Sequence, residues 1–393
     1  MKMNIKHGAL VALLAAGFSS AALADSAETK GGIKVKTDDG RFEGSLSGRI
    51  HYDINVIDGD EDGDLLGSSG DLSDVFFRRA RLTFSGKAYG WEYKFEQDFG
   101  GGAPTERDLY IATKLGSGKL LLGQFKPFRG MEEMTSSNEI TFMERPYVQA
   151  NFPSEQFSMG AGYTGGGDAF TYAIGVQNRK VDGAGNNSSE DMVTSARLTF
   201  APLNSDGSVL HFGLSGSVDN LNRTGAGVQN TDRVTVQYAG RNVGTLNLSS
   251  PFIEGTFIGA ELGAAFGPFF IQSEYMQGDL DLVAAGASEK TAAYYVQTSF
   301  HVTGESKPYK SGVFKSVKPN NTFGAVELKA RYEMAENKDA VAADADVSAI
   351  TVGANWYVNS NVRFMLDYIM AEVGAGLGKD EPSVIAARAQ FSF

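Results

Sequence analysis

The chain contains no cysteine, and this absence removes several classes of protein at once. Zinc fingers, disulfide-stapled scaffolds and thiol catalysis all depend on cysteine. Only four histidines occur, His7, His51, His211 and His301, and none has the paired spacing of a catalytic zinc site. We therefore expect neither a metal nor a cofactor.

Long apolar runs and a positive charge balance are also missing. After residue 24 no apolar run reaches 18 residues, so no membrane-spanning helix is expected there. The 35 basic residues face 47 acidic ones, a net charge of −12, which opposes nucleic-acid binding. Proline is scarce (10 residues), whereas 48 glycines, 26 phenylalanines and 15 tyrosines favour strands and turns.

The first 24 residues have the pattern of a secretory signal peptide. Lys2 and Lys6 precede an apolar stretch over residues 9–18, and small residues end at Ala22-Leu23-Ala24. The apolar stretch is shorter than the ~20 residues that a spanning helix needs. We expect cleavage near Ala24 and a single mature domain over residues 25–393.

The dominant pattern in the rest of the chain has period two. Between Phe42 and Val56 the even positions are apolar or glycine and the odd positions are polar. The same alternation recurs near residues 79–85, 91–96, 197–200, 210–215, 326–333, 362–368 and 385–393. A soluble β-sandwich also alternates, but segments of ~10 residues suit tilted strands that cross a bilayer. Charges of both signs on the polar face suit a water-filled lumen, so we predict an all-β transmembrane antiparallel barrel.

About seventeen candidate strands can be counted from the alternation rule. A single-chain bacterial barrel needs an even number of strands, and sixteen is the closer fit to this length. A barrel of that width encloses an aqueous channel. The last strand ends at Phe393, which resembles the signal read by the assembly machinery of outer-membrane barrels.

Three connecting segments stand out. Residues 126–156 are long and lack strand alternation, so we expect a packed loop folded into the lumen. Asp58, Asp60, Asp62 and Gly63 begin like a calcium loop, but Ser69 replaces its final glutamate, which favours a solvated loop. Gly160 to Gly165 matches a dinucleotide-binding pattern, yet no helical pattern follows, which favours a strand and turn.

Several motifs in order along the mature chain resemble the phosphate-selective porin O and P family. They are Phe76-Phe-Arg-Arg-Ala-Arg-Leu82, Thr135-Ser-Ser137 with Phe142-Met-Glu-Arg145, Phe200-Ala-Pro-Leu203, Thr303-Gly-Glu-Ser-Lys307 with Tyr309-Lys310, Gly324-Ala-Val-Glu-Leu328 and Gly353-Ala-Asn-Trp-Tyr357. The resemblance implies a sixteen-stranded trimeric porin of the Gram-negative outer membrane, in contact with lipid and lipopolysaccharide. It also implies an inward third loop and basic residues that guide anions to a constriction.

The resemblance assigns roles to individual residues. Arg49, Arg78 and Arg79 match the family's anion-binding arginines, Asp108 its constriction aspartate and Arg145 a basic loop residue. Lys126 and Arg129 are further basic residues of the constriction loop. Glu133 and Asn138 stand where phosphate-selective members carry lysine, which should weaken anion preference.

Strand parity adds its own expectations for the arginines. It places Arg49, Arg79 and Arg81 on the lumen face, and Arg78 on the lipid face unless a bulge turns it inward or it lies beyond the apolar belt. A lipid-facing arginine at mid-depth would cost ~2–4 kcal/mol. The simpler interpretation is that lumen charges only hold water and pair across strands, above all at Arg197, Arg331, Arg363 and Arg388.

We therefore expect a passive channel for small anions, with phosphate or polyphosphate as candidate solutes. The net charge and Glu133 keep open a general or cation-preferring porin of the same fold. An outer-membrane lipase-type enzyme with His211 or His301 as base, and a non-conducting structural barrel, are the alternatives of another class. No set of nucleophile, base and orienting group is legible for such an enzyme.

Overall fold

The structure is a computed structural model, and it describes most of the chain after residue 25. The described ranges are 26–28, 32–58, 72–101, 104–149, 157–178, 192–220, 231–233, 245–247, 251–284, 286–338, 345–375 and 378–393. The expected signal peptide and the acidic stretch 59–71 lie outside these ranges. Among the described residues, no helix is long and apolar enough to span a membrane.

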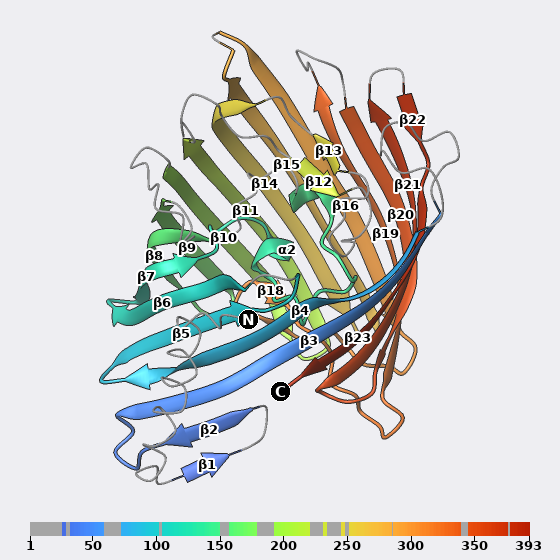
Figure 1. Cartoon of the computed structure of the whole chain (residues 1–393). Coiled ribbons are helices and arrows are strands. Elements are labelled where there is room, and N and C mark those ends of the chain that lie inside the picture. The colour runs from blue at the N-terminus through green and yellow to red at the C-terminus, as the bar shows by residue number, and fades with distance from the viewer. Residues whose placement is uncertain are drawn as a thin grey trace, which may run out of the picture.

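Sixteen antiparallel strands form one closed barrel, as the sequence predicted (Figure 1). Each strand pairs with the next, and the last pairs with the first. The barrel strands are β3 (Phe42–Asp58), β4 (Leu72–Ala88), β5 (Trp91–Asp98), β6 (Thr105–Leu115), β7 (Gly118–Phe125), β8 (Ser158–Gly166), β9 (Phe170–Gln177), β10 (Met192–Ser205), β11 (Ser208–Asn220), β14 (Phe252–Phe266), β15 (Phe269–Leu282), β16 (Ser288–His301), β19 (Ala325–Lys338), β20 (Ala345–Tyr357), β21 (Val362–Ala375) and β23 (Ser383–Ser392). The predicted nucleotide-like segment Gly160–Gly165 lies within β8 and forms part of the wall.

The described ranges also contain seven short strands outside the set of sixteen. They are β1 (Ser26–Glu28), β2 (Ile33–Lys36), β12 (Thr231–Arg233), β13 (Thr245–Asn247), β17 (Tyr309–Lys310), β18 (Val313–Phe314) and β22 (Gly378–Asp380). Strand β2 pairs with the first part of β3, and β23 pairs with the rest of it. Backbone hydrogen bonds between Gly48 and Phe393 (2.9 and 3.1 Å) join the two edges where the chain ends.

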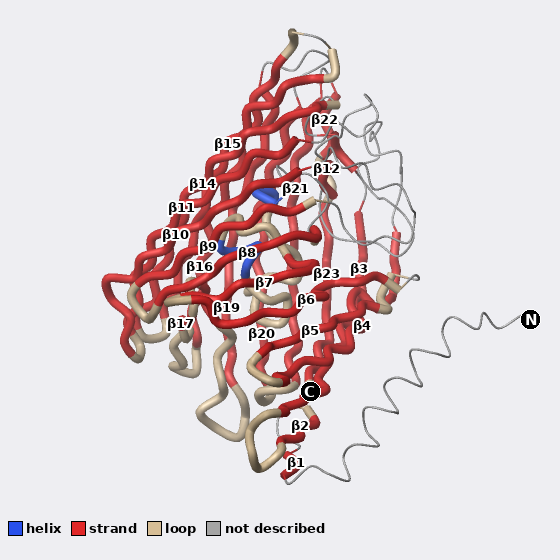
Figure 2. The backbone as a smooth tube through the Cα atoms, turned by 90° about the vertical axis from the view of Figure 1, so that its left-hand side faces the viewer, coloured by secondary structure: helices blue, strands red, loops and turns tan. Residues whose placement is uncertain are grey.

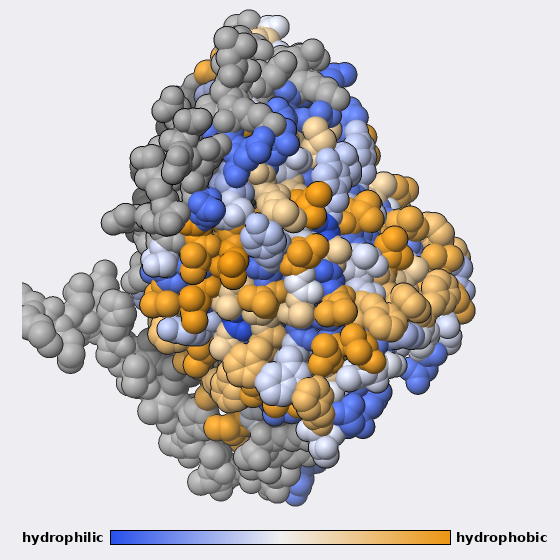
Figure 3. Space-filling view, turned by 90° about the vertical axis from the view of Figure 1, so that its right-hand side faces the viewer, coloured by the Kyte–Doolittle hydropathy of each residue, from blue (hydrophilic) through white to orange (hydrophobic). Residues whose placement is uncertain are grey.

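The period-two pattern separates a polar lumen from an apolar outer wall. In β21 the side chains of Phe364, Leu366 and Tyr368 are exposed on the outside, whereas Arg363 and Asp367 are buried inside. The apolar side chains gather over the middle of the outer wall (Figure 3). Apolar surface of this kind is stable against lipid hydrocarbon and not against water.

The described part of the segment between β7 and β8 is residues 126–149 together with Phe157, and residues 126–149 enter the barrel and pack on its inner wall (Figures 1 and 2). It carries the short helix α2 (Met131–Met134) and the 3-10 turn η2 (Tyr147–Gln149). It is the third connection at the end of the barrel opposite Phe393. We call it the third loop below.

Backbone amides hold the first half of the third loop. The Glu274 carboxylate of β15 accepts the N–H groups of Met131 (2.7 Å) and Glu132 (2.8 Å) at the start of α2. The hydroxyls of Ser195 and Ser215 accept the N–H groups of Phe128 and Gly130. These wall acceptors satisfy backbone donors that would otherwise be buried without a partner.

Backbone carbonyls hold the second half of the third loop. Four wall cations donate hydrogen bonds of 2.6 to 3.0 Å to four carbonyl oxygens: Arg363 to Ile140, Lys329 to Thr141, Arg388 to Met143 and Arg331 to Glu144. Arg331, Arg363 and Arg388 therefore do more than hold water and pair across strands, which corrects the simpler interpretation of these charges. They fix the path of the loop.

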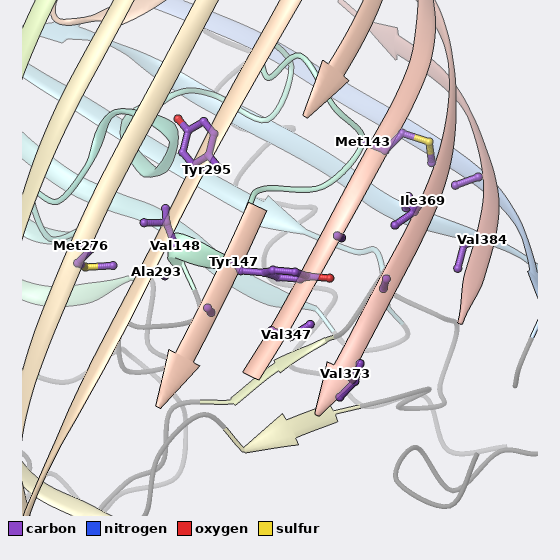
Figure 4. Close-up of a cluster of buried hydrophobic side chains, with 14 of the residues drawn as sticks. Met143, Tyr147, Val148, Met276, Ala293, Tyr295, Val347, Ile369, Val373 and Val384 are labelled. Carbon is purple, nitrogen blue, oxygen red and sulfur yellow. The ribbon is translucent and has the colours of Figure 1, made fainter. Parts of the chain in front are cut away.

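An apolar cluster strengthens this attachment. Met143, Tyr147 and Val148 of the third loop pack against inward-facing Met276, Ala293, Tyr295, Val347, Ile369, Val373 and Val384 of the wall (Figure 4). Tyr147, for example, is only 4% exposed. The loop therefore packs on the side of the lumen formed by β10 to β23 and leaves the side formed by β3 to β7 open.

A second segment enters the barrel from the other end. Residues 302–324 connect β16 to β19 and contain the β17–β18 hairpin. Phe314 packs against Phe270 and the third loop's Met131, and Arg197 donates a hydrogen bond to the Gly312 carbonyl (2.7 Å). Arg197 is thus a loop anchor as well, a role that the sequence did not reveal.

Candidate functional site

The open side of the lumen is a cavity of about 690 Å³ between the third loop and the wall. Its lining has ten cationic side chains, Arg49, Arg78, Arg79, Arg81, Lys94, Arg107, Lys126, Arg145, Lys315 and Arg331. Five acidic side chains accompany them, Glu96, Asp98, Asp108, Glu144 and Glu333. The lining therefore carries five more positive than negative side chains, of which Lys126 and Lys315 pair with Glu133 and Glu139 outside it, in a chain whose net charge is −12.

A β-bulge in β4 brings Arg78 into this cavity. His51 of β3 pairs with Arg79, and the next residue, Tyr52, pairs with Phe77, so Arg78 is the extra residue. Both Arg78 and Arg79 then contact Glu144 of the third loop. Of the two ways in which Arg78 was expected to avoid lipid, the bulge is the one observed.

A second bulge, in β6, acts in the same way. Phe95 pairs with Leu109 and Gln97 with Glu106, so two residues of β6, Arg107 and Asp108, oppose the single residue Glu96. Both Arg107 and Asp108 line the cavity. Two neighbouring pairs of strands thus place consecutive charged residues on the lumen face.

Five arginines of the cavity share three carboxylates. The Glu144 carboxylate accepts two hydrogen bonds from the Arg78 guanidinium (2.7 and 2.9 Å) and lies 3.6 Å from that of Arg79. Glu96 pairs with Arg49 (3.1 Å) and Arg81 (3.0 Å). Asp98 pairs with Arg81 (2.7 Å) and Arg107 (3.4 Å). The arginines are held in place by these carboxylates without being fully neutralised.

Asp108, the predicted constriction aspartate, pairs with a lysine and not with an arginine. Its carboxylate pairs with Lys94 of β5 at 2.5 Å, whereas Glu96, Asp98 and Glu144 orient the arginines. The odd–even alternation of strand residues alone could not predict the Asp108–Lys94 pair, because the bulge shifts Asp108 relative to β5. Asp108 does line the cavity, as expected.

Only some of the third-loop residues predicted from the sequence line the cavity. Lys126 and Arg145 line the cavity. Arg129 instead pairs with Asp219 of the wall, and Asn138 hydrogen-bonds His51 at 3.0 Å. Neither Arg129 nor Asn138 is part of the cavity lining, because a loop packed on a wall must turn about half of its side chains toward that wall.

Glu133 is also removed from the cavity. Its carboxylate is buried and pairs with Lys126 (Nζ–Oε1 2.7 Å). Burial raises the pKa of Glu133, but the nearby Lys126 and Arg145 cations outweigh this effect and leave the pKa below its usual value. The acidic residue that argued against anion preference is therefore paired and sequestered.

The charges of the third loop respond to the same surroundings. Burial lowers the pKa of Lys126 to about 8, helped by repulsion from Arg145 and opposed by Glu133. Burial raises the pKa of Glu144, yet the Arg78, Arg79 and Arg388 guanidiniums hold it well below its usual value. Glu144 is therefore ionised at neutral pH, whereas Lys126 loses its charge as the pH rises through about 8.

Four cationic residues of the cavity lining were not predicted from the sequence to belong to the site. Lys94 shares its strand face with Glu92 and Glu96, a signal that alternation could have used. Arg107 could not be placed without the bulge, and Lys315 reaches the cavity from the second inward segment. Arg331 was recognised as a lumen charge only.

The two histidines considered as catalytic bases, His211 and His301, take part in structural contacts. His211 is fully buried, 3.1 Å from Glu261 and 2.6 Å from the Tyr309 hydroxyl, and His301 lies 3.6 Å from Glu327. Within the described ranges no group of three potential ligands could hold a metal ion.

Comparison with known proteins agrees with this geometry. The family model described as phosphate-selective porin O and P matches residues 45–393. The chain belongs to the phosphate-selective porin O and P family. It is thus an outer-membrane porin of Gram-negative bacteria, and a channel rather than an enzyme is what family and fold indicate.

Individual relatives support the assignment. Porin O of Pseudomonas aeruginosa is 29% identical, over 98% of this porin and 97% of its own length. An anion-selective porin from Comamonas acidovorans has the same fold with a TM-score of 0.59 and 12% identity, covering 90% of this chain and 100% of its own. The trimer form of OmpT from Vibrio cholerae superposes with a TM-score of 0.56 and 13% identity, covering 90% of this chain and 99% of its own.

Proposed function

We propose that this porin conducts small anions and that its cavity binds tetrahedral oxyanions such as phosphate and polyphosphate. The observation that carries the proposal is the sharing of three carboxylates among five arginines of the cavity. An anion that enters supplies the missing negative charge. Guanidinium groups can offer it paired, charge-assisted hydrogen bonds that replace its hydration.

The alternative of a general or cation-preferring porin rested on the net charge and on Glu133. Pairing with Lys126 neutralises Glu133, and the lining itself is positive. The field along a narrow path depends on nearby charges, because charges more than ~10 Å away are screened at 0.1 M salt. The lining therefore supports anion preference over the alternative.

Planar-bilayer recording tests the proposal. In a KCl gradient the zero-current potential should show anion preference, and phosphate added to KCl should reduce the chloride current. The double variant Arg78→Gln with Arg79→Gln should lose most of the phosphate block. Arg41→Gln is the matched control, because Arg41 is exposed and pairs with Asp39 outside the cavity.

Two results would decide against the proposal. Cation preference of the wild-type porin would support the alternative function. Anion preference without phosphate block would leave an anion channel whose arginines do not bind oxyanions.

We also propose that the mature protein, residues 25–393, assembles as a homotrimer in the outer membrane. The fold is shared with a protein whose trimer form is known, and a signal peptide over residues 1–24 accounts for export. In this proposal the assembly machinery recognises the terminal aromatic residue Phe393, and the apolar outer wall (Figure 3) contacts lipid and lipopolysaccharide. Light scattering in detergent should give three copies, and N-terminal sequencing should begin at Asp25.

A further inference from the structure

The cavity has a second, apolar side that a channel for inorganic anions alone does not need. Alongside the charges, its lining includes Tyr110, Leu121, Phe125, Phe128, Met134 and Phe157. These residues come from β6, β7 and the third loop, next to the arginines of β3 and β4. Apolar side chains offer no donors to replace the hydration of phosphate or chloride.

The apolar side is a packed and preformed surface. The Tyr110 and Phe125 rings meet edge to face with centroids 6.4 Å apart, and the Phe125 and Phe128 centroids lie 5.6 Å apart. Glycines in the wall make room for these rings. A Cβ at Gly162 would lie 2.8 Å from the Phe125 ring, and one at Gly175 would lie 3.2 Å from the Phe128 ring.

Tyr110 and Met134 present this surface to the cavity. Both are partly exposed, whereas Phe125 and Phe128 behind them are 3% and 5% exposed. Burying an aromatic or apolar body against such a surface is favourable. The cavity volume of about 690 Å³ falls within the ~300–1,000 Å³ that is usual for small organic ligands.

Cations border the apolar side directly. The Arg107 guanidinium and the Lys126 ammonium lie 5.5 and 5.6 Å from the centroid of the Phe157 ring. Lys94 lies beside Tyr110, because their positions pair across β5 and β6. An anionic group held by these cations would place an attached ring over Tyr110 and Met134.

We propose that the cavity binds phosphate monoesters with an aromatic body in preference to those without one. The inference deepens the proposed function and rests on it, since the phosphoryl group uses the same cations. The cations hold the phosphoryl group, and Tyr110, Leu121 and Met134 hold the ring. Tyr110 is then a specificity-determining residue of the channel.

A comparison of phenyl phosphate with methyl phosphate tests the inference, because the two share a head group and differ in the ring. Each is added to KCl in planar-bilayer recordings of the full porin, and the concentration for half-block of the chloride current is measured. Phenyl phosphate should block at about tenfold lower concentration, equivalent to ~1.4 kcal/mol. Tyr110→Ser should remove most of that difference, measured as the ratio of the two half-block concentrations.

Two variants serve as controls. Tyr110→Phe keeps the ring and should keep the preference, which also shows that the position tolerates change. Tyr163→Ser removes a tyrosine that lies outside the cavity lining and bonds the Leu115 carbonyl, so it should behave as wild type.

The outcomes separate the inference from the function on which it rests. Equal block by the two esters, with anion preference intact, would overturn the inference alone. Loss of block by both esters in Tyr110→Ser would assign Tyr110 to the head group and also overturn it. Cation preference in the KCl gradient would overturn the proposed function itself.

Discussion

Replacing Arg388 with methionine should release the middle of the third loop. Arg388 is fully buried in β23, and its guanidinium pairs with both oxygens of Asp53 in β3 at 2.7 Å. The same group donates to the Met143 carbonyl (2.6 Å) and reaches Glu144 (3.0 Å). One side chain therefore links the two strands that close the barrel to the loop that narrows it.

The size of the effect follows from these contacts. Arg388→Met leaves Asp53 buried without its cation, and breaking such a pair costs about 3–5 kcal/mol. The double variant Asp53→Asn with Arg388→Met removes the stranded charge. Its remaining loss is the unsatisfied Met143 carbonyl, about 1–3 kcal/mol.

Two measurements on the same variants check the reasoning. Urea unfolding in lipid vesicles should rank the free energy of unfolding as wild type, then the double variant, then Arg388→Met. Single-channel recording should show larger open-channel noise and altered conductance in both variants, since each frees the Met143 region. Arg388→Lys keeps a charge and should fall between wild type and Arg388→Met.

The reasoning fails if stability falls while conductance and noise equal those of wild type. Arg388 would then brace β23 against β3 without positioning the loop. It also fails if the single and double variants are equally stable, because the buried Asp53 charge would then carry no penalty.

Three more predictions follow from the other charged groups. Since Lys126 has a pKa of about 8, about nine in ten molecules carry its charge at pH 7 and about one in ten at pH 9. Zero-current potentials should therefore show that anion preference falls as the pH rises through 8. Lys126→Arg should abolish this pH dependence, and its persistence in that variant would contradict the assignment to Lys126. Glu144→Gln removes a carboxylate that is ionised at neutral pH, so the anion-to-cation permeability ratio should rise and phosphate should block the chloride current at lower concentration. An unchanged permeability ratio would show that Glu144 does not act on the conducted ion. Arg197→Met leaves the buried Glu261 without its arginine partner and the Gly312 carbonyl without its hydrogen bond, so the free energy of unfolding should fall by about 3–5 kcal/mol. The zero-current potential of this variant in planar bilayers should equal that of the wild type. A shifted potential would place Arg197 in the conducting path.

The barrel could be predicted from the sequence because its determinant is local. Alternation in Phe42 to Val56 needs no knowledge of the partner strand, and it placed Arg49 on the lumen side correctly. The number of strands followed from chain length and the requirement for an even count. These signals survive in a single sequence.

The site was harder to predict because its determinants are distant in sequence. Arg388 acts on Met143, 245 positions away, and nothing near Arg388 marks that contact. The inward position of Arg78 depends on how β4 pairs with β3, not on its own neighbours. The separation of Glu133 from the cavity likewise depends on how the third loop lies against the wall.

The two bulges also change how charge is distributed along the direction of travel. A regular antiparallel strand turns one side chain to the lumen every ~6.8 Å, twice the rise per residue. At Arg78–Arg79 and at Arg107–Asp108 successive residues face the lumen, so the linear density of ionised groups along each strand roughly doubles at its bulge. Single-residue insertions can therefore tune a pore's charge without altering its number of strands.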